Sequence, residues 1–386
     1  MSITLMVAAG EGLRVGQKKV ADNFGRDIMI VHSGRTSMQA GGTRSGRPVR
    51  WTATDHIAVI SQAPSCRYVL PEIGTETAIT SAYNSATLLV TGSLAAFAEV
   101  RTIPIGEGRF YNDEDSASAN RVAVLGSDAK KQLFGGRSAL GETIRVGDFP
   151  YTVIGVMQHK EQDSSYDGRD ISKVFIPFGT ILRDFPNKPP STPDSVDRLL
   201  AVPRSLHDHE PCKLEVRRGL ARLHNFDPRD EEAAPIWDTI ENSKAFEKMT
   251  NGMKLFLGAV GIVSLLLGGI GVMNVMLVAV RERTREIGVR KAVGATRGAI
   301  LRQFFLETLI IVFLSGGAGM CFAWGLCALV NSFPMPEFFA GLIAGWDSGL
   351  LAFALLGTIA VLSALYPASR AAAIDPIEAL RYEAGG

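Results

Sequence analysis

The sequence predicts an α+β multi-domain membrane protein, in which a mixed α/β extracytoplasmic domain is joined to an α-helical transmembrane bundle. Three long uncharged runs lie in the C-terminal part of the chain, and each has the roughly 20 residues that a helix needs to cross a bilayer. Most charged residues precede residue 251. The mean hydropathy of +0.15 is therefore an average over a polar part and an apolar part of the chain.

The first uncharged run, Leu255–Val280, indicates the orientation of the chain. Lys and Arg gather beside the cytoplasmic ends of membrane spans, so a basic segment after a run is expected inside the cell. The polar domain before the run is then expected outside, and the C-terminus, with Arg370 and Arg381, inside. The basic residues that follow the run are Arg281, Arg283, Arg285, Arg290, Lys291 and Arg297.

The pattern divides the chain into three parts. Residues 1–24 are expected to form the end of a truncated first membrane helix and a stalk. Met1–Ala9 is apolar but too short for a full span, and Gly10–Phe24 predicts an amphipathic helix that continues it. The extracytoplasmic domain is expected over residues 25–238, and the stalk helix and transmembrane domain over residues 239–386.

In the polar domain, the pattern of apolar runs and turn residues predicts that short strands alternate with short helices. Ser33–Arg50 and Phe185–Asp197 are rich in Gly, Ser or Pro and predict loops, and Gly147-Asp148 predicts a hairpin turn. Apolar runs predict strands at Asp27–His32, Ala86–Val90, Arg121–Leu125, Thr143–Val146, Tyr151–Met157, Lys173–Ile176 and Leu199–Val202. Helices are predicted at Thr54–Ser61, capped by Thr54 or Asp55, at Leu94–Val100, at Ser127–Phe134, capped by Ser127, and at Lys213–Leu223.

From Thr239 the sequence predicts one continuous helix that runs into the span at about residues 255–280. Such a helix would connect the two domains stiffly. Two further spans are predicted at about 308–331 and 348–369, separated by an interfacial outer turn at Ser332–Asp347 that contains prolines and aromatic residues.

Small residues in the first full span predict close helix packing. Ser264 and Gly268 have a small-xxx-small spacing, and Gly271 follows one turn later. The Asn274 amide is expected to hydrogen-bond to another helix, because an unpaired amide in hydrocarbon is costly. We expect these four residues to serve bundle packing rather than a substrate channel.

The four cysteines fall into two pairs. Cys321 and Cys327 lie in an apolar span and are expected to behave as small hydrophobic residues. Cys66 and Cys212 lie in the polar domain, where an extracytoplasmic location permits a disulfide. Pairing needs Cα atoms within about 7 Å of each other, so the sequence leaves this bond open.

Sequence motifs for common enzyme chemistry are absent. The chain contains no GxxxxGK[ST] phosphate loop, no HExxH zinc helix and no GxSxG nucleophile elbow. The run His207–Glu210 lacks further Cys or His partners for a metal. With a net charge of +1, nucleic acid is not an expected partner. We therefore expect a non-catalytic chain without cofactor or metal, driven by a partner.

Two stretches, Gly268–Glu307 and Tyr366–Glu383, resemble the permease motif of the macrolide-exporter (MacB) and FtsX-like family of ABC transporters. In the polar domain, Gly108–Asp115, Arg121–Gly136 and Tyr151–Met157 are similar to the periplasmic core domain of that family. The resemblance covers nearly the whole chain. The macrolide exporter also carries its own ATPase domain, and the present sequence resembles the arrangement in which the ATPase is a separate polypeptide.

The resemblance implies a permease subunit in the cell inner membrane that uses ATP bound by a separate ABC ATPase to move its periplasmic domain. It implies a second permease copy, identical or not, and membrane lipid as partners, with a periplasmic membrane-fusion adaptor and an outer-membrane channel as further ones. Export or extraction of an amphiphilic or peptide-like substrate is expected. The alternative is an FtsX-type scaffold that controls a cell-wall hydrolase without transport; the large outer domain favours the exporter.

The resemblance also implies that Arg283–Gly294 is a coupling helix that docks in the ATPase. Retention of positive charge inside the cell explains its basic residues but not the interleaved Glu282 and Glu286 or its apolar positions. The expected ATPase contacts are Arg283, Arg285, Glu286, Ile287, Arg290, Lys291, Ala292 and Gly294.

Overall fold

The computed structural model describes residues 2–24, 27–39, 44–160, 166–336, 339–375, 377 and 379. Parts of the predicted loop at Ser33–Arg50, part of the predicted outer turn, and Arg381 lie outside these residues.

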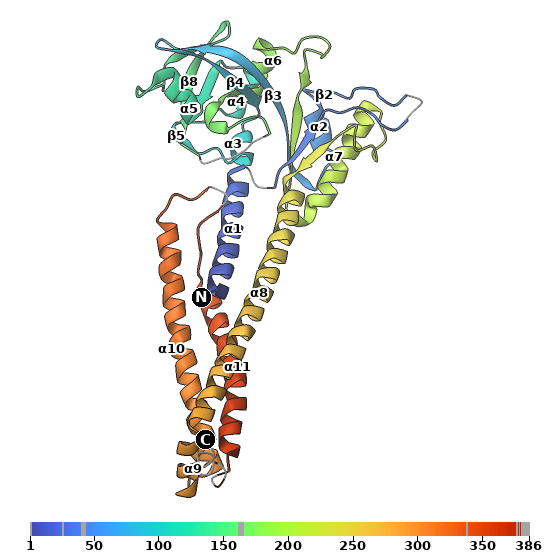
Figure 1. Cartoon of the computed structure of the whole chain (residues 1–386). Coiled ribbons are helices and arrows are strands. Elements are labelled where there is room, and N and C mark those ends of the chain that lie inside the picture. The colour runs from blue at the N-terminus through green and yellow to red at the C-terminus, as the bar shows by residue number, and fades with distance from the viewer. Residues whose placement is uncertain are drawn as a thin grey trace. The chain divides into compact units, whose positions relative to one another are not determined.

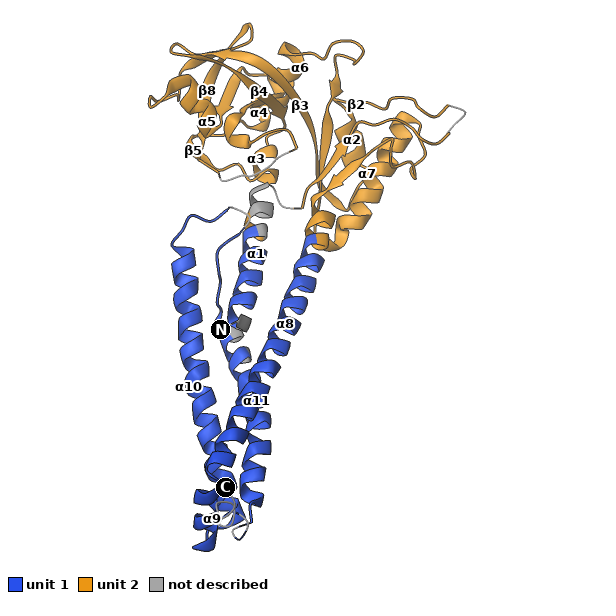
Figure 2. Ribbon diagram, viewed as in Figure 1, with its two compact units in different colours: residues 1–17, 246–386 blue, residues 18–245 orange. Residues whose placement is uncertain are grey.

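The chain divides into two compact units (Figure 2). The polar unit is Lys18–Ala245, and the helical unit combines Met1–Gln17 with Phe246–Gly386. Both boundaries fall within helices, α1 (Ser2–Phe24) and α8 (Thr239–Glu282), so each of these helices belongs to both units. The predicted boundaries, at residues 25 and 239, instead follow the last residue of α1 and coincide with the first residue of α8.

A ten-stranded sheet forms the centre of the polar unit (Figure 1). Its strands are β1 (Met29–His32), β3 (Cys66–Thr80), β4 (Ser85–Ser93), β5 (Ile105–Gly108), β6 (Val122–Leu125), β7 (Thr143–Val146), β8 (Phe149–Met157), β9 (Val174–Pro177), β11 (Arg198–Pro203) and β12 (Ile236–Asp238). Their order is β12-β1-β11-β3-β4-β9-β6-β8-β5, and β7 pairs with β3 and β8. The β4–β9 and β6–β8 pairs are parallel and the other pairs are antiparallel, so the sheet is mixed.

The remaining elements of the polar unit are short. The strands β2 (Trp51–Thr52) and β10 (Ser195–Val196) pair with each other. The helices are α2 (Asp55–Ile60), α3 (Phe97–Val100), α4 (Asp113–Ala117), α5 (Ser127–Phe134), α6 (Phe178–Asp184) and α7 (His209–His224), with single 3-10 turns at Asp170–Ser172 and Leu206–Asp208. Ser127 was the expected cap of α5, but the cap residue is Gly126, because its backbone is extended and the helix already begins at Ser127.

Side chains alternate between two hydrophobic cores, because successive residues of a strand point to opposite faces. On β1, Met29 and Val31 belong to one core, while Ile30 belongs to the other. Trp51 is fully buried in the first core and Phe97 in the second. The sheet is thus covered on both faces.

The sequence patterns locate most strands but not β3, the longest one. Pro71 and Gly74 interrupt it, and it carries Glu72 and Glu76, all residue types that strands disfavour. The strand forms because it pairs with β11 on one side and β4 on the other, where position in the sheet overrides local propensity. The elements β5, β12, α4 and α6 likewise form in stretches for which the sequence indicates no element.

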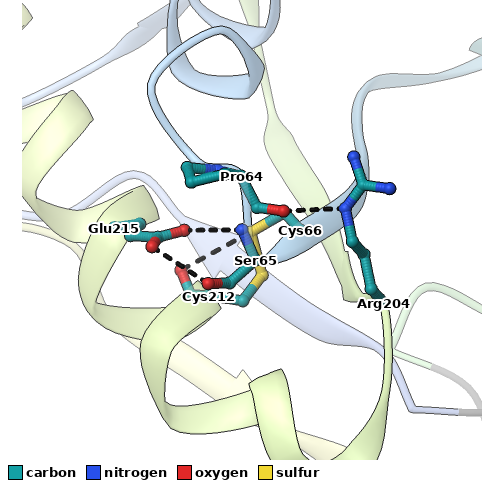
Figure 3. Close-up of a disulfide and its surroundings, with 6 residues drawn as sticks. All are labelled: Pro64, Ser65, Cys66, Arg204, Cys212 and Glu215. Atoms are coloured by element: carbon teal, nitrogen blue, oxygen red, sulfur yellow. Dashed lines mark hydrogen bonds between the residues drawn. A yellow bond between two sulfur atoms is a disulfide. The ribbon is translucent and has the colours of Figure 1, made fainter.

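Cys66 and Cys212 form a disulfide, with a Cα–Cα distance of 5.0 Å (Figure 3). The bond joins the first residue of β3 to α7. Beside it, the Glu215 carboxylate accepts hydrogen bonds from the Ser65 amide and hydroxyl, both at 3.0 Å. The pairing that the sequence left open is thereby resolved.

Three of the described helices are long and apolar enough to cross a membrane. They are α8, α10 (Arg297–Asn331) and α11 (Trp346–Ala373), which contain the predicted spans. The continuous helix predicted from Thr239 is confirmed, since α8 runs unbroken to Glu282. The short helix α9 (Thr284–Ala292) lies between α8 and α10 in the chain.

The first helix packs into the helical unit through glycine. A Cβ on Gly12 would lie 1.6 Å from the Gly341 carbonyl oxygen, so only glycine fits there. The Gly12 carbonyl in turn accepts a hydrogen bond of 3.0 Å from the Ala340 amide. An ion pair of 2.8 Å between Glu11 and Lys254 joins α1 to α8.

The small residues predicted for helix packing make no close helix contact in the part of the chain that the structure describes. Ser264, Gly268, Gly271 and Asn274 are exposed, and the Ser264 hydroxyl donates to Val260 of its own helix at 2.9 Å. The next residue, Gly269, makes the contact instead, because a Cβ there would lie 2.6 Å from Ile359 of α11. Adjacent helical positions differ by about 100° around the axis, so the predicted row faces away from α11.

Candidate functional site

The local sequence shapes the predicted coupling segment into the separate helix α9. The Thr284 hydroxyl donates to the Arg281 carbonyl at 2.7 Å, where α8 ends and α9 begins. After α9, Gly294 has a φ of +106°, which L side chains rarely adopt, so glycine allows the chain to turn. Thr296 then caps α10 by accepting from the Ala299 amide.

One side of α9 is buried against the three long helices. Ile287 is fully buried, and Gly288 is buried beside it. Ile287 is therefore removed from the predicted ATPase contacts, because its side chain is used inside the chain. The cluster around it comprises Met276 and Val280 of α8, Ile300 and Phe304 of α10, and Ala368 and Ala371 of α11.

Polar contacts fix α9 further. The Lys291 ammonium donates to the Ala372 carbonyl at 3.0 Å and to the Ile374 carbonyl, and so it caps the C-terminal end of α11, where a cation is favoured. Arg290 pairs with Glu286 and donates to Gln303 at 3.1 Å.

Just before α9, the guanidinium of Arg283 lies 3.2 Å from the carboxylate of Glu307 in α10. Three of the predicted ATPase-contact residues, Arg283, Arg290 and Lys291, thus also hold α9 against its own chain.

The opposite side of α9 is exposed and partly apolar. Val293 is 85% exposed and Val289 46%, and Ala292, Arg285 and Glu286 also face outward. A hollow of about 580 Å³, here called the α9 groove, lies beside them. It is lined by Val289, Arg290, Val293, Gly294, Ala295, Ala299, Ile300 and Gln303.

The predicted set and the α9 groove overlap only at Arg290 and Gly294. Ala295, Ala299 and Gln303 were missed because they follow α9 in sequence. Ala295 lines the groove from the linker before α10, and Ala299 and Gln303 line it from the first turns of α10. The four-residue spacings Val289–Val293 and Ala295–Ala299 are the signal that could have found them.

No group of three or more His, Cys, Asp or Glu side chains suited to a metal occurs among the described residues. In the His207–Glu210 run, the His209 ring is instead 2.6 Å from the Asp238 carboxylate. His209 of this run thus contacts a residue of the same fold.

Comparison with known proteins matches both units to one family. Residues 1–206 match the MacB-like periplasmic core domain, and residues 258–376 match the FtsX-like permease C-terminal domain. The chain is 32% identical to the ABC transporter permease YknZ of Bacillus subtilis over 76% of this chain and 70% of that protein. It is 33% identical to the macrolide export ATP-binding/permease protein MacB of a Shewanella species, over 99% of this chain and 56% of that one.

A third relative is the pyoverdine export ATP-binding/permease protein PvdT of Pseudomonas aeruginosa, at 30% identity over 98% of this chain and 54% of that one. The periplasmic region of MacB from Actinobacillus actinomycetemcomitans superposes with a TM-score of 0.47 at 19% identity, covering 60% of this chain and 98% of that one, which adds nothing to the assignment. The chain spans about half the length of the MacB and PvdT relatives. The two domain matches and the YknZ relative show that the chain belongs to the MacB/FtsX-like family of ABC transporter permeases.

Proposed function

We propose that this permease couples ATP hydrolysis by a separate ATPase to movement of its polar unit outside the cell inner membrane. The observation that carries the proposal is the two-sided character of α9. Its inner side is fixed to α8, α10 and α11 through Ile287 and Lys291, while its outer side presents Val289 and Val293 beside the α9 groove. A partner that presses on α9 would therefore move three long helices together.

The continuity of α8 supports the second half of the proposal. This helix has 44 residues, and it begins directly after β12 of the sheet and ends just before α9. At 1.5 Å per residue it is roughly 65 Å long, and the i to i−4 hydrogen bonds along it resist stretching. A displacement at α9 would thus reach the first turn of α8 in the polar unit.

The relatives guide the proposed substrate and partners. Two of them are named as macrolide and pyoverdine export proteins. We propose export or extraction of an amphiphilic or peptide-like molecule by two permease copies, with ATP bound by the ATPase and no cofactor in this chain. The exposed apolar side of α8 suits membrane lipid or a second copy. A periplasmic adaptor and an outer-membrane channel would complete an exporter.

The proposal is tested by placing a charge on the exposed side of α9. Val293→Glu should abolish co-purification with the ATPase that accompanies the wild-type chain and the ATP hydrolysis of that complex, because a carboxylate would be buried at the contact. Leu206→Glu, also an exposed apolar position but in the polar unit, is the matched control and should retain both. Wild-type ATPase binding and activity in Val293→Glu would contradict docking at α9.

A further inference from the structure

Helix α7 carries an Asp–His pair at each end, and the two pairs are chemically alike. At its start, the His209 ring nitrogen lies 2.6 Å from the Asp238 carboxylate. At its end, the His224 ring nitrogen lies 2.7 Å from the Asp55 carboxylate. The pairs differ in what the aspartate belongs to. Asp55 opens the short helix α2, whereas Asp238 is the last residue of β12 and directly precedes α8.

Asp238 joins α7 to the first turn of α8. One carboxylate oxygen accepts from the backbone amides of Ile240 at 3.0 Å and Glu241 at 3.1 Å, as a helix cap does. The other oxygen faces His209 and, at 3.1 Å, the Lys213 ammonium. Burial opposes ionisation of Asp238, but the hydrogen bonds from Glu241, His209 and Lys213 outweigh it and hold its pKa below the usual range.

Lys213 makes a second contact with α8. Its ammonium lies 3.0 Å from the carboxylate of Glu241, in the first turn of that helix. Asp238 is 5% exposed, so its charge is held by partners rather than by water, and such charge-assisted hydrogen bonds are stronger than neutral ones.

The same end of α7 is bonded to the centre of the sheet. Cys212, three residues after His209, forms the disulfide with Cys66 of β3. One turn later, Glu215 holds the amide and hydroxyl of Ser65 (Figure 3). The strand β3 pairs with β11, β4 and β7. The Asp238 carboxylate, with His209 and Lys213, thus connects α8 to α7. About two turns of α7 then lead to the disulfide and to Glu215, which connect α7 to β3 and to Ser65 before it.

We propose that His209, Lys213 and Asp238 form the attachment through which α8 moves α7 and, through the disulfide of α7, the strand β3, beside the direct continuation of β12 into α8. The three are positioning residues. The proposal rests on the proposed function, in which ATP-driven displacement travels along α8. A second contact, between Thr239 and the Ile28 carbonyl at 2.7 Å, keeps the start of α8 in place when the attachment is weakened.

The test is amide hydrogen exchange on the full chain bound to its co-purified ATPase, with and without ATP. In Asp238→Asn, the amide oxygen still caps α8, but the charge that holds His209 and Lys213 is gone. Exchange in the first turn of α8 should be about tenfold faster, because a charge-assisted contact is lost. The ATP-dependent change should persist in α8 and disappear from α7, while ATP hydrolysis continues.

Asp55→Asn is the matched control, because it removes the same kind of pair from the other end of α7. It should leave the ATP response of α7 intact, as should Lys213→Arg, whereas Lys213→Met should reduce that response. A normal α7 response in Asp238→Asn, or an equal loss in Asp55→Asn, would overturn the attachment. Absence of any ATP response in α8 of the wild-type complex would instead refute the proposed function, and the attachment with it.

Discussion

Glu72 is an ionisable residue buried in the polar unit. It lies on β3 and is fully buried, where the Tyr166 hydroxyl donates a hydrogen bond to it. Burial raises the pKa of Glu72 and the charge of the Asp167 carboxylate raises it further, whereas the charges of Arg198 and Lys173 oppose the rise. Burial and the charge of Asp167 together raise the pKa of Glu72 to about 7.

This shift predicts a pH dependence of stability. The pKa of Glu72 is 4.5 when it is not perturbed, so between pH 4.5 and about 7 the folded chain holds a proton that the unfolded chain has released. Stability from this group is therefore complete below pH 4.5 and falls as pH rises, by up to about 1.4 kcal/mol per pH unit. Glu72→Gln should abolish this slope, measured as the melting temperature of the polar unit in the full chain across this pH range.

Glu76→Gln is the control for that experiment, because Glu76 is exposed on the same strand. Its melting temperature should follow the wild-type pH profile. Parallel profiles for the wild-type chain and Glu72→Gln would mean that the folded chain already holds Glu72 ionised at pH 5.

Gly12 and Gly268 allow a second comparison at single positions. A Cβ on Gly12 would collide with the Gly341 backbone, whereas a Cβ on Gly268 would meet nothing within 4 Å. Gly12→Ala should lower the stability of the detergent-solubilised chain by about 1–3 kcal/mol through overpacking. Gly268→Ala should be neutral or stabilising, because alanine favours helix over glycine. Equal melting temperatures for the two variants would show that the loop at Gly341 yields without cost.

At the scale of elements, the sequence predicts where α9 lies but not which way it faces. Its position follows from the end of the uncharged run and the basic residues after it. Ile287 and Val293 are both apolar, yet one is buried by α8, α10 and α11 and the other is exposed. A short helix with apolar residues on two sides cannot be oriented without the partners that cover it. The sequence likewise does not show that the row at Gly268 lies on the exposed side of α8.

The disulfide is an element-scale feature whose energetic effect is testable. It closes a loop across a sequence separation of 146 residues, and both cysteines are fully buried. Because a cross-link removes conformational freedom from the unfolded chain, Cys66→Ala with Cys212→Ala should cost about 2–5 kcal/mol of stability. The melting temperature of the full chain measures this, with Cys321→Ala as the control outside the bond. An unchanged melting temperature would contradict a stabilising bond.

For the whole molecule, charge distribution alone predicts the division between sheet domain and helices. The lengths of the apolar runs predict the three long helices, because whether a helix can cross a membrane depends on its length and composition rather than on its contacts. The order of the strands in the sheet cannot be predicted from the sequence, because β3 and β12 pair with strands far away in the chain. The contacts of Asp238 depend on the same long-range pairing, so they could not be predicted from the sequence either.

Orientation across the membrane is the whole-molecule prediction on which the proposed function depends. In a Cys321→Ser background, which removes the exposed free thiol, a cysteine at Val293 and one at Ser118 report the two sides. An impermeant maleimide applied to intact cells should label Ser118→Cys and spare Val293→Cys, because the basic segment around α9 is retained inside. Both positions are exposed, so both should react after permeabilisation. Labelling of Val293→Cys alone in intact cells would put α9 outside, where no ATPase could reach it.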